Sequence, residues 1–323
     1  MRIFESICRK FVLNYKQAQT IREQSAYHVQ FYNFWSQPNE QMYWSNFLMS
    51  QHFLLEGKTA SFFSVFGDKS IIDKVHTDVK IFFSGENLKR DAFVQYSDHC
   101  LSNPSIDLAI GFEVFEHPRY VRFPLWMMDC LFPADSSKEA IRAKCQQVRF
   151  PMIENKNKFC CLIASNGADG LRKEMYDIIN KIAQVDSAGQ YLHNDDALQN
   201  QYNDNKLAYM QRYLFNICPE NSSAYGYTTE KIFEAISAGC IPVYWGAEFA
   251  DKEVINENAI IRWNREDDGQ TAILQIHELY SNPQLLNDFL SQPRLLPTAE
   301  EYILDMFYTL ENKLAMFVSK SKY

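Results

Sequence analysis

The sequence lacks most of the short motifs that identify metal sites and hydrolytic centres. Its 323 residues contain no CxxC pair, no HExxH, no GxSxG, and neither the GxGxxG nor the P-loop glycine spacing. No DxD motif follows an expected strand, because the acidic pairs at 195–196 and 267–268 lie in polar stretches. We therefore expect no metal site. The scattered histidines are interpreted as non-catalytic: His76, His99, His117 and His193.

A basic surface and long apolar runs are also absent. The net charge of −8 argues against a protein that grips a nucleic-acid backbone. No run reaches the ~20 apolar residues of a membrane span, and charges interrupt the N-terminal MRIFESICRKFVLNYKQ too often for a signal peptide. We expect a soluble, cytoplasmic protein without a transmembrane segment. The tail KLAMFVSKSKY is expected to form a terminal core helix, with peripheral contact to the inner membrane face as the alternative.

The eight cysteines do not follow the pattern of a disulfide framework. Cys160 and Cys161 are adjacent, and Cys218 and Cys240 lie in apolar, strand-like runs. Buried free thiols in a reducing compartment are therefore expected. Aromatic residues make up 15% of the chain, and we expect most of them in the core, although Trp and Tyr also suit stacking on sugar rings.

The chain length suits two domains of about 150 residues each. Short, continuously apolar runs predict strands buried on both faces of a parallel sheet, at 61–67, 78–87, 107–113, 159–166, 213–221 and 240–246. Helical periodicity follows at 171–184, and at 229–239 with Gly239 as the C-cap. This alternation predicts an α/β fold. The polar segment 131–158, with its two prolines, is the expected interdomain region.

Polar side chains follow three of the expected strands, where ligands bind in open α/β sheets. In KIFFSGEN, Glu86 follows Gly85 and is either a general base or a simple turn residue. In IASNGADGLRKE, Arg172 opens a helix after a glycine-containing loop, which alone is a weak signal for a phosphate site.

The third strand end, ICPENSSAYGYTTEKIF, gathers the most candidate groups. A helix N-terminus supplies free N–H groups for an anion, yet Lys231 in its first turn is unfavourable there unless an anion lies nearby. Glu230 can accept two hydroxyls, and Tyr227 can stack on or hydrogen-bond a ligand. A nucleotide diphosphate sugar would satisfy these groups together. The alternative is a surface helix with a neutral Glu-Lys pair.

The segment GYTTEKIFEAISAGCIPVYWG (226–246) closely resembles the α-1,3/α-1,4-fucosyltransferases, glycosyltransferase family ten, of the bacterial type. CPENSSAYGYTTEKI resembles their donor loop, and FCCLIASN with Arg172 resembles a second family segment. VKIFFSGEN, followed by DLAIGFE and RYVRFPLW, resembles the N-terminal half of bacterial members. The stretch EVFEHPRY is shorter than in those members, so the acceptor side is expected to differ.

The resemblance implies a GT-B architecture, two Rossmann-like domains facing a cleft. Residues 1–150 would form the acceptor-binding domain, and residues 151–323 the GDP-fucose-binding domain. In a variant of this arrangement, the last helix would pack back on the N-terminal domain. It implies an inverting transfer of L-fucose with Glu86 as the general base; Glu113 and Glu116 are the reserves. It also implies donor binding by Arg172, Asn221, Tyr227, Glu230 and Lys231.

The resemblance implies GDP-fucose as donor substrate, no cofactor, and an oligosaccharide acceptor. The family's common acceptor is N-acetylglucosamine in N-acetyllactosamine, and glucose in lactose is an alternative. Lewis-type products, on lipopolysaccharide or protein glycans, would follow. Two other functions stay open: a GT-B transferase that uses another nucleotide sugar, and a non-catalytic module that binds a nucleotide sugar or glycan.

Overall fold

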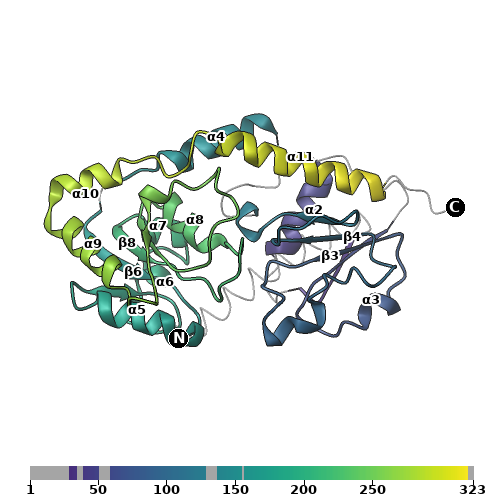
Figure 1. The fold of residues 1–323 in the computed structure, drawn as a ribbon, viewed down its shortest axis with the longest axis horizontal. Coiled ribbons are helices and arrows are strands. Elements are labelled where there is room, and N and C mark those ends of the chain that lie inside the picture. The colour runs from purple at the N-terminus through teal and green to yellow at the C-terminus, as the bar shows by residue number, and fades with distance from the viewer. Residues whose placement is uncertain (1–28, 35–38, 51–58, 129–136, 155, 319–323) are drawn as a thin grey trace. The chain divides into compact units, whose positions relative to one another are not determined.

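The strands form two separate parallel sheets, each with its own helices (Figure 1). The structure is a computed structural model and describes residues 29–34, 39–50, 59–128, 137–154 and 156–318. Contacts divide the chain into two compact units. Of the described residues, unit 1 holds those up to Phe123 and from Asp305 on, and unit 2 holds those from Pro124 to Leu304.

Unit 1 is built on five parallel strands in the order β1-β2-β3-β4-β5. They are β1 (Val29–Tyr32), β2 (Ala60–Phe63), β3 (Val79–Phe83), β4 (Leu108–Gly111) and β5 (Tyr120–Arg122). Its helices are α2 (Asn39–Ser50), α3 (Ile71–Lys74) and the 3-10 helix η2 (Asp91–Tyr96). The strands β2, β3 and β4 are buried along their whole length, which explains their continuous apolar sequences.

Aromatic side chains fill one face of the unit 1 sheet. Trp44 of α2 stacks on Phe62 with 5.5 Å between ring centroids, and it meets the ring of Phe83 edge-on at 5.2 Å. The other face is packed by apolar residues of α3 and η2. Much of the high aromatic content therefore forms the core of this unit.

Unit 2 is built on a second set of five parallel strands in the order β10-β9-β8-β6-β7. They are β6 (Lys158–Leu162), β7 (Val185–Ser187), β8 (Tyr213–Ile217), β9 (Ile241–Tyr244) and β10 (Ile261–Arg262). The α-helices are α4 (Lys138–Arg149), α5 (Leu171–Ile179), α6 (Ala197–Asn200), α7 (Lys206–Met210), α8 (Glu230–Ser237), α9 (Gln270–Ser281) and α10 (Pro283–Leu290). The 3-10 helices are η3 (Leu125–Met127), η4 (Ala168–Gly170) and η5 (Glu257–Ala259).

The unit 2 sheet is covered on both faces. Apolar residues of α5, α9 and α10 form a single cluster with residues of β6, β8 and β9. On the opposite face α8 packs along β9, and Phe233 of α8 stacks on Trp126 of η3 at 4.6 Å. The last helix, α11 (Ala299–Val318), begins in unit 2 and continues in unit 1 from Asp305 on.

The six predicted strands are confirmed as β2, β3, β4, β6, β8 and β9, although each is shorter than its apolar run. The four strands that the sequence did not predict are the edges of the two sheets: β1, β5, β7 and β10. These edge strands are two to four residues long, and β1, β5 and β10 are partly exposed, so they lack the continuous apolar run that marks a central strand.

One helical prediction needed correction. The helix predicted at 171–184 ends at Ile179, where the chain turns through Asn180 to Ala183 towards β7. The segment 131–158, predicted as the interdomain region, contains the helix α4. Its apolar stripe of Ile141, Cys145 and Val148 is buried, and Ser137 caps its start by accepting a hydrogen bond from the Ala140 N–H.

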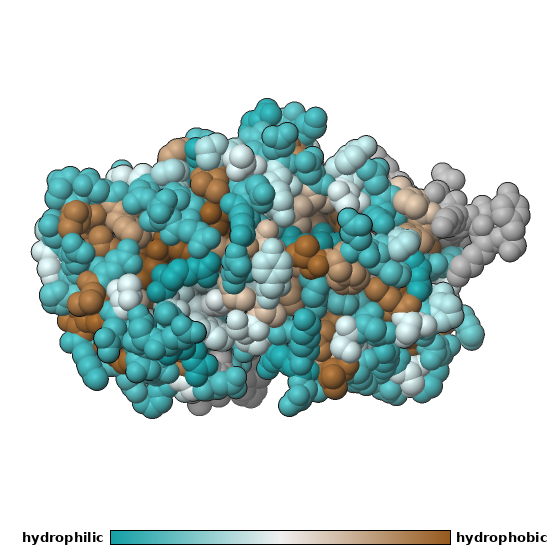
Figure 2. Space-filling view, viewed as in Figure 1, coloured by the Kyte–Doolittle hydropathy of each residue, from teal (hydrophilic) through white to brown (hydrophobic). Residues whose placement is uncertain are grey.

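The surface shown in Figure 2 is mostly hydrophilic, with apolar residues in several separate groups. Among the helices of the described chain, none is long and apolar enough to cross a membrane. The six cysteines within the described ranges are free and buried, as predicted, while Cys8 and Cys130 fall outside them. The expected terminal core helix is α11, in which Leu314 is buried; residues 319–323 of the tail lie outside the described part.

Candidate functional site

The carboxyl ends of β6 and β8 bring Arg172 and Asn221 together in unit 2. Because β6 and β8 are paired parallel neighbours, the loops that leave them start side by side. Arg172, in the first turn of α5, donates to the side-chain oxygen of Asn166 at 2.7 Å and to that of Asn221 at 2.7 Å. It also donates to the backbone oxygen of Asn166 at 2.8 Å.

Arg172 is a buried cation whose partners are all neutral. Arg172 is 4% exposed, and its hydrogen bonds to described residues go to amide oxygens only. Within the described ranges it forms no ion pair with a carboxylate. Burial consequently lowers the pKa of Arg172 from its ordinary value, although the nearby charges of Glu220 and Glu230 oppose this shift. A buried guanidinium without a direct counter-ion favours an anionic ligand.

The start of α8 is organised by a buried carboxylate, Glu220. This side chain accepts hydrogen bonds from the Thr229 N–H at 2.8 Å and from the Thr229 hydroxyl at 2.6 Å. Tyr244 donates to it at 3.3 Å, and Lys231 forms an ion pair with it at 3.4 Å. Burial raises the pKa of Glu220, and Lys231 opposes this shift.

Lys231 lies between two carboxylates, Glu220 and Glu230, each at 3.4 Å from its ammonium nitrogen. Burial alone would lower the pKa of Lys231, but these carboxylates raise it above its ordinary value. The lysine is therefore held in its charged form. The anion that the sequence required near the start of this helix is thus present in the protein itself as Glu220.

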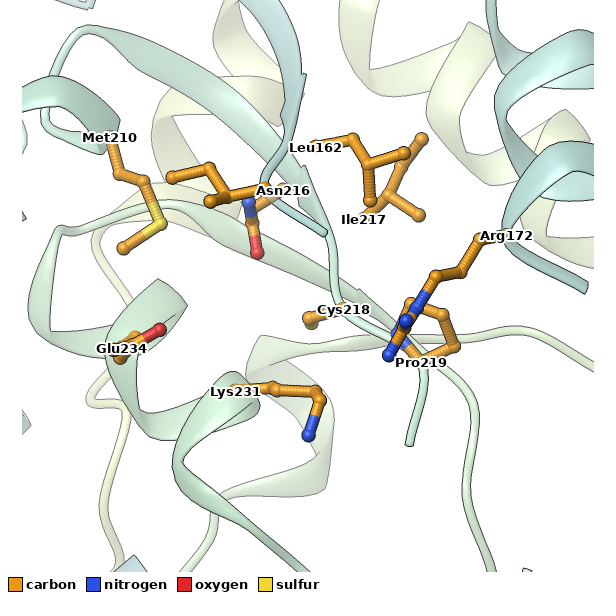
Figure 3. Close-up of a pocket in the computed structure, with 10 residues that line it drawn as sticks. Leu162, Arg172, Met210, Asn216, Ile217, Cys218, Pro219, Lys231 and Glu234 are labelled. Atoms are coloured by element: carbon orange, nitrogen blue, oxygen red, sulfur yellow. The ribbon is translucent and has the colours of Figure 1, made fainter. Parts of the chain in front are cut away.

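Arg172 and Lys231 line the same pocket (Figure 3). The pocket is formed by Leu162, Ile163, Arg172, Met210, Asn216, Ile217, Cys218, Pro219, Lys231 and Glu234. In Figure 3 the Arg172 and Lys231 side chains extend from α5 and α8 towards the segment that follows β8. Two cations from different helices therefore line one pocket beside the N-terminus of α8, and a helix N-terminus favours an anion.

The tyrosines of the loop before α8 differ in exposure. Tyr227, a predicted donor-binding residue, is buried, whereas Tyr225 is 52% exposed. Between them Gly226 has a φ of 76°, a left-handed conformation that glycine adopts readily. The loop thus directs one tyrosine into the unit and the other to solvent.

The predicted base, Glu86, belongs to unit 1 and follows β3. It is buried and forms an ion pair with Arg90 at 3.4 Å. Of the reserves, Glu113 follows β4 and pairs with the ring Nε2 of His99 at 2.7 Å, while Glu116 is exposed. His99 is itself buried, so it reaches no solvent directly.

No cluster of three or more His, Cys, Asp or Glu side chains suited to a metal ion occurs in the described part of the chain. Asp195 instead joins a structural network, in which it accepts from Tyr209 at 3.0 Å and from Lys158 at 3.4 Å. His193 pairs with Asp196 at 2.8 Å on the surface.

The sequence did not single out Glu220 as a site residue, although its neighbour Asn221 was chosen. The available signal was its position directly after a buried strand, nine residues before the helix-start Thr229 that it contacts. A carboxylate close to a helix N-terminus is stabilised by the helix dipole. Spacing alone does not reveal this contact, because the loop between the two residues must fold back.

Two Rossmann-like units, each with a central parallel sheet, define a protein of the GT-B class. Solved structures agree: an α1,3-fucosyltransferase superposes with a TM-score of 0.57 at 20% identity, covering 88% of this chain and 89% of that one. The same enzyme class solved with GDP-fucose gives a TM-score of 0.57 at 19% identity over 91% of both chains. These likenesses confirm the predicted fold class.

Two family profiles cover most of the chain. The "Alpha-(1,3)-fucosyltransferase FucT N-terminal domain" matches residues 29–129, and "Glycosyltransferase family 10 (fucosyltransferase) C-term" matches residues 153–294. The chain therefore belongs to glycosyltransferase family 10, as the sequence resemblance indicated.

Named relatives include the α-(1,3)-fucosyltransferase FucT of Helicobacter pylori, 27% identical over 240 residues, which are 65% of this chain and 46% of that protein. The α-(1,3)-fucosyltransferase B of Drosophila melanogaster is 29% identical over 127 residues, 36% of this chain and 28% of that protein. The chain thus spans less than half the length of these relatives.

Proposed function

We propose that this protein transfers L-fucose from GDP-fucose to a hydroxyl of an N-acetyllactosamine- or lactose-type glycan, with inversion at the fucose C1. The observation that carries the donor assignment is the buried guanidinium of Arg172, which has only neutral partners and faces the same pocket as Lys231. A diphosphate supplies the missing negative charge. Membership of family 10 supports fucose as the transferred sugar.

In the proposed reaction Glu86 takes the proton from the acceptor hydroxyl as that oxygen attacks C1 of fucose. The bond between C1 and the diphosphate oxygen breaks, and GDP leaves with the electron pair. Arg172, Lys231 and the N–H groups at the start of α8 stabilise the charge that develops on the leaving group. Because this charge grows as the bond breaks, these cations act more strongly on the transition state than on bound donor.

The remaining donor residues are assigned to hydroxyl groups. Glu230, half-buried beside Lys231, accepts hydroxyls of ribose or fucose, and Asn221 and Tyr227 complete the donor-binding set. We assign unit 1 to acceptor binding and unit 2 to donor binding. Compared with the division at residue 150 predicted from the sequence, this places residues 124–128 and α4 in the donor-binding unit, and the part of α11 from Asp305 on in the acceptor-binding unit.

The donor assignment is tested by substituting Lys231. Lys231→Met removes one charge-assisted contact to phosphate, so we expect GDP-fucose affinity to fall about 10- to 100-fold. The control is Lys173→Met, which removes an exposed lysine two residues into α5 that pairs with Asp177. Calorimetry measures both. Equal affinities for Lys231→Met and the wild type would contradict the phosphate role.

Two further measurements distinguish the proposed function from its two alternatives, a transferase that uses another nucleotide sugar and a non-catalytic binding module. In thermal-shift experiments only the true donor class should stabilise the fold strongly, so GDP compounds are compared with UDP and CMP compounds. Radiolabelled fucose transfer is then measured with lactose and N-acetyllactosamine. Stabilisation by a UDP sugar would show that the donor is a UDP sugar and not GDP-fucose. Donor binding without transfer to any acceptor would favour a non-catalytic module.

A further inference from the structure

The loop after β4 carries an aromatic platform that the donor assignment does not use. Phe115 is 41% exposed, and its ring stacks on Tyr120 with 4.0 Å between centroids and 22° between planes. Its centroid also lies 5.3 Å from the His99 ring. One face of Phe115 is thus supported by the protein, while the residue stays open to solvent.

A carboxylate lies at the base of this platform. Glu113 Oε2 pairs with His99 Nε2 at 2.7 Å, and the Glu113 backbone oxygen accepts from the Tyr120 hydroxyl at 2.9 Å. The second carboxylate oxygen, Oε1, has no hydrogen-bond partner among the described residues. An ionised carboxylate accepts at both oxygens, so Oε1 retains full capacity for a hydroxyl group. The Glu113 side chain is 17% exposed, so it is partly open to solvent.

The sheet register places this loop beside the proposed base. In the parallel ladder, Phe83 of β3 is paired with Ile110 of β4, and the Ser84 N–H donates to the Ile110 oxygen at 3.0 Å. Glu86 and Glu113 each follow these paired residues by three positions. The two carboxylates therefore leave the same edge of the sheet from neighbouring strands, which lie about 4.8 Å apart.

We propose that Phe115 and Glu113 form a subsite for a hexopyranose ring of the acceptor. The exposed face of Phe115 stacks on the apolar C–H face of the sugar, and Glu113 Oε1 accepts one of its hydroxyls. His99 holds the carboxylate in this orientation. The subsite rests on the proposed function, because the sugar that it binds is the acceptor of that reaction.

The test is steady-state kinetics of fucose transfer with lactose or N-acetyllactosamine. Phe115→Ala removes the stacking surface, and we expect the acceptor KM to rise about tenfold, which corresponds to ~1.4 kcal/mol. The donor KM should not change, and kcat should change little. Phe115→Trp restores an aromatic face and should restore the acceptor KM. The matched control is Val114→Ala, which truncates the neighbouring side chain, itself 55% exposed.

Glu113→Gln tests the second part of the subsite. It should also raise the acceptor KM while most turnover remains at saturating acceptor. A collapse of kcat in this variant would make Glu113 the base and overturn its assignment to the subsite. An unchanged acceptor KM in Phe115→Ala, with a normal thermal transition, would overturn the platform.

Direct binding keeps the subsite testable if the proposed reaction fails. Saturation-transfer NMR with lactose and the unmodified protein in the presence of GDP needs no turnover. Loss of the sugar signal in Phe115→Ala but not in Val114→Ala would support the subsite even if fucose were not transferred. Equal signals in all three proteins, or none with the unmodified protein, would refute it.

Discussion

Lys231 shows how a residue that is unfavourable for its own helix becomes useful in its tertiary setting. A cation in the first turn opposes the positive end of the helix dipole. Here Glu220 and Glu230 lie 3.4 Å away and compensate for that position. Hydrogen bonds from Thr229 and Tyr244 offset part of the desolvation cost of burying Glu220. The lysine is thereby oriented towards the pocket that it shares with Arg172.

Substitution of the proposed base separates catalysis from donor binding. Glu86→Gln keeps the size of the side chain but cannot take a proton, so kcat should fall about 10²- to 10⁴-fold. GDP-fucose affinity should be retained, because Arg172 and Lys231 are unchanged. The control is Asp91→Asn, an exposed carboxylate of the same unit. Normal turnover in Glu86→Gln would remove this residue from the role.

The raised pKa of Glu220 predicts a pH dependence of stability. Burial raises this pKa above the ordinary value of 4.5, so the folded protein holds the proton to higher pH than the unfolded chain. The stabilising contribution is complete below the unfolded value and is lost as pH rises through the folded value.

The glutamine side chain of Glu220→Gln does not titrate, so this substitution removes the pH-dependent contribution to the free energy of unfolding. We expect the free energy of unfolding of the wild type, minus that of Glu220→Gln, to decrease as the pH rises from 4.5 towards neutrality. Urea titrations at a series of pH values measure this difference. A difference that grew with pH would show that the hydrogen bonds and Lys231 outweigh burial.

At the scale of the element, α8 begins with a contact to a residue outside the helix and ends with a left-handed glycine. Thr229 precedes it in an extended conformation and makes no side-chain cap hydrogen bond, since its hydroxyl donates to Glu220 instead. At the other end Gly239 has a φ of 71°, and its N–H bonds to the oxygen of Ile236. The C-cap is Ala238, and Gly239, predicted as the cap, follows it in the left-handed conformation that commonly ends a helix.

A pair of glycine substitutions tests this helix end. At Gly239 an added Cβ would lie 2.3 Å from the Met152 backbone oxygen, whereas at Gly170, with a φ of 85°, it would meet nothing within 4 Å. Gly170→Ala should cost only the left-handed strain of roughly 1–2 kcal/mol. Gly239→Ala should cost clearly more, because the backbone must also move. Equal losses of unfolding free energy in the two variants, measured by chemical denaturation, would show that the backbone relieves the clash at Gly239 without a further energetic cost.

At the scale of the whole molecule, α11 joins the two units. Its residues up to Leu304 belong to unit 2, and those from Asp305 on belong to unit 1. Within unit 1, Phe307 packs against Phe47 at 6.1 Å and Phe123 at 5.4 Å between ring centroids. Phe307 of α11 thus contributes to the aromatic core of unit 1.

Removal of the Phe307 ring should destabilise unit 1 selectively. Phe307→Ala removes a buried aromatic ring, and we expect a loss of about 3–5 kcal/mol. Native-state amide exchange should accelerate in β2 and β3 but not in β8 and β9. The control, Tyr308→Ala on the same helix, truncates a side chain that is 65% exposed and should cost under about 0.5 kcal/mol. Uniform acceleration in both sheets would contradict independent units.

The sequence by itself determined the parallel α/β class, the central strands and the helix α8 that precedes Gly239. It did so because central strands are buried on both faces and therefore read as continuous apolar runs. The motif around Glu230 and Lys231 also indicated the family, which the profiles then established.

Only the tertiary structure decided the edge strands, the burial of Tyr227 and the role of Glu220. Edge strands are recognised by the neighbour with which they pair, and the local sequence does not show that pairing. The pairing of Glu220 with Thr229 and Lys231, and of His99 with Glu113, likewise depends on loops that fold back at a sheet edge. Local periodicity in the sequence indicates which residues are buried. Contacts between loops, in contrast, arise only when the strands beneath them are in register.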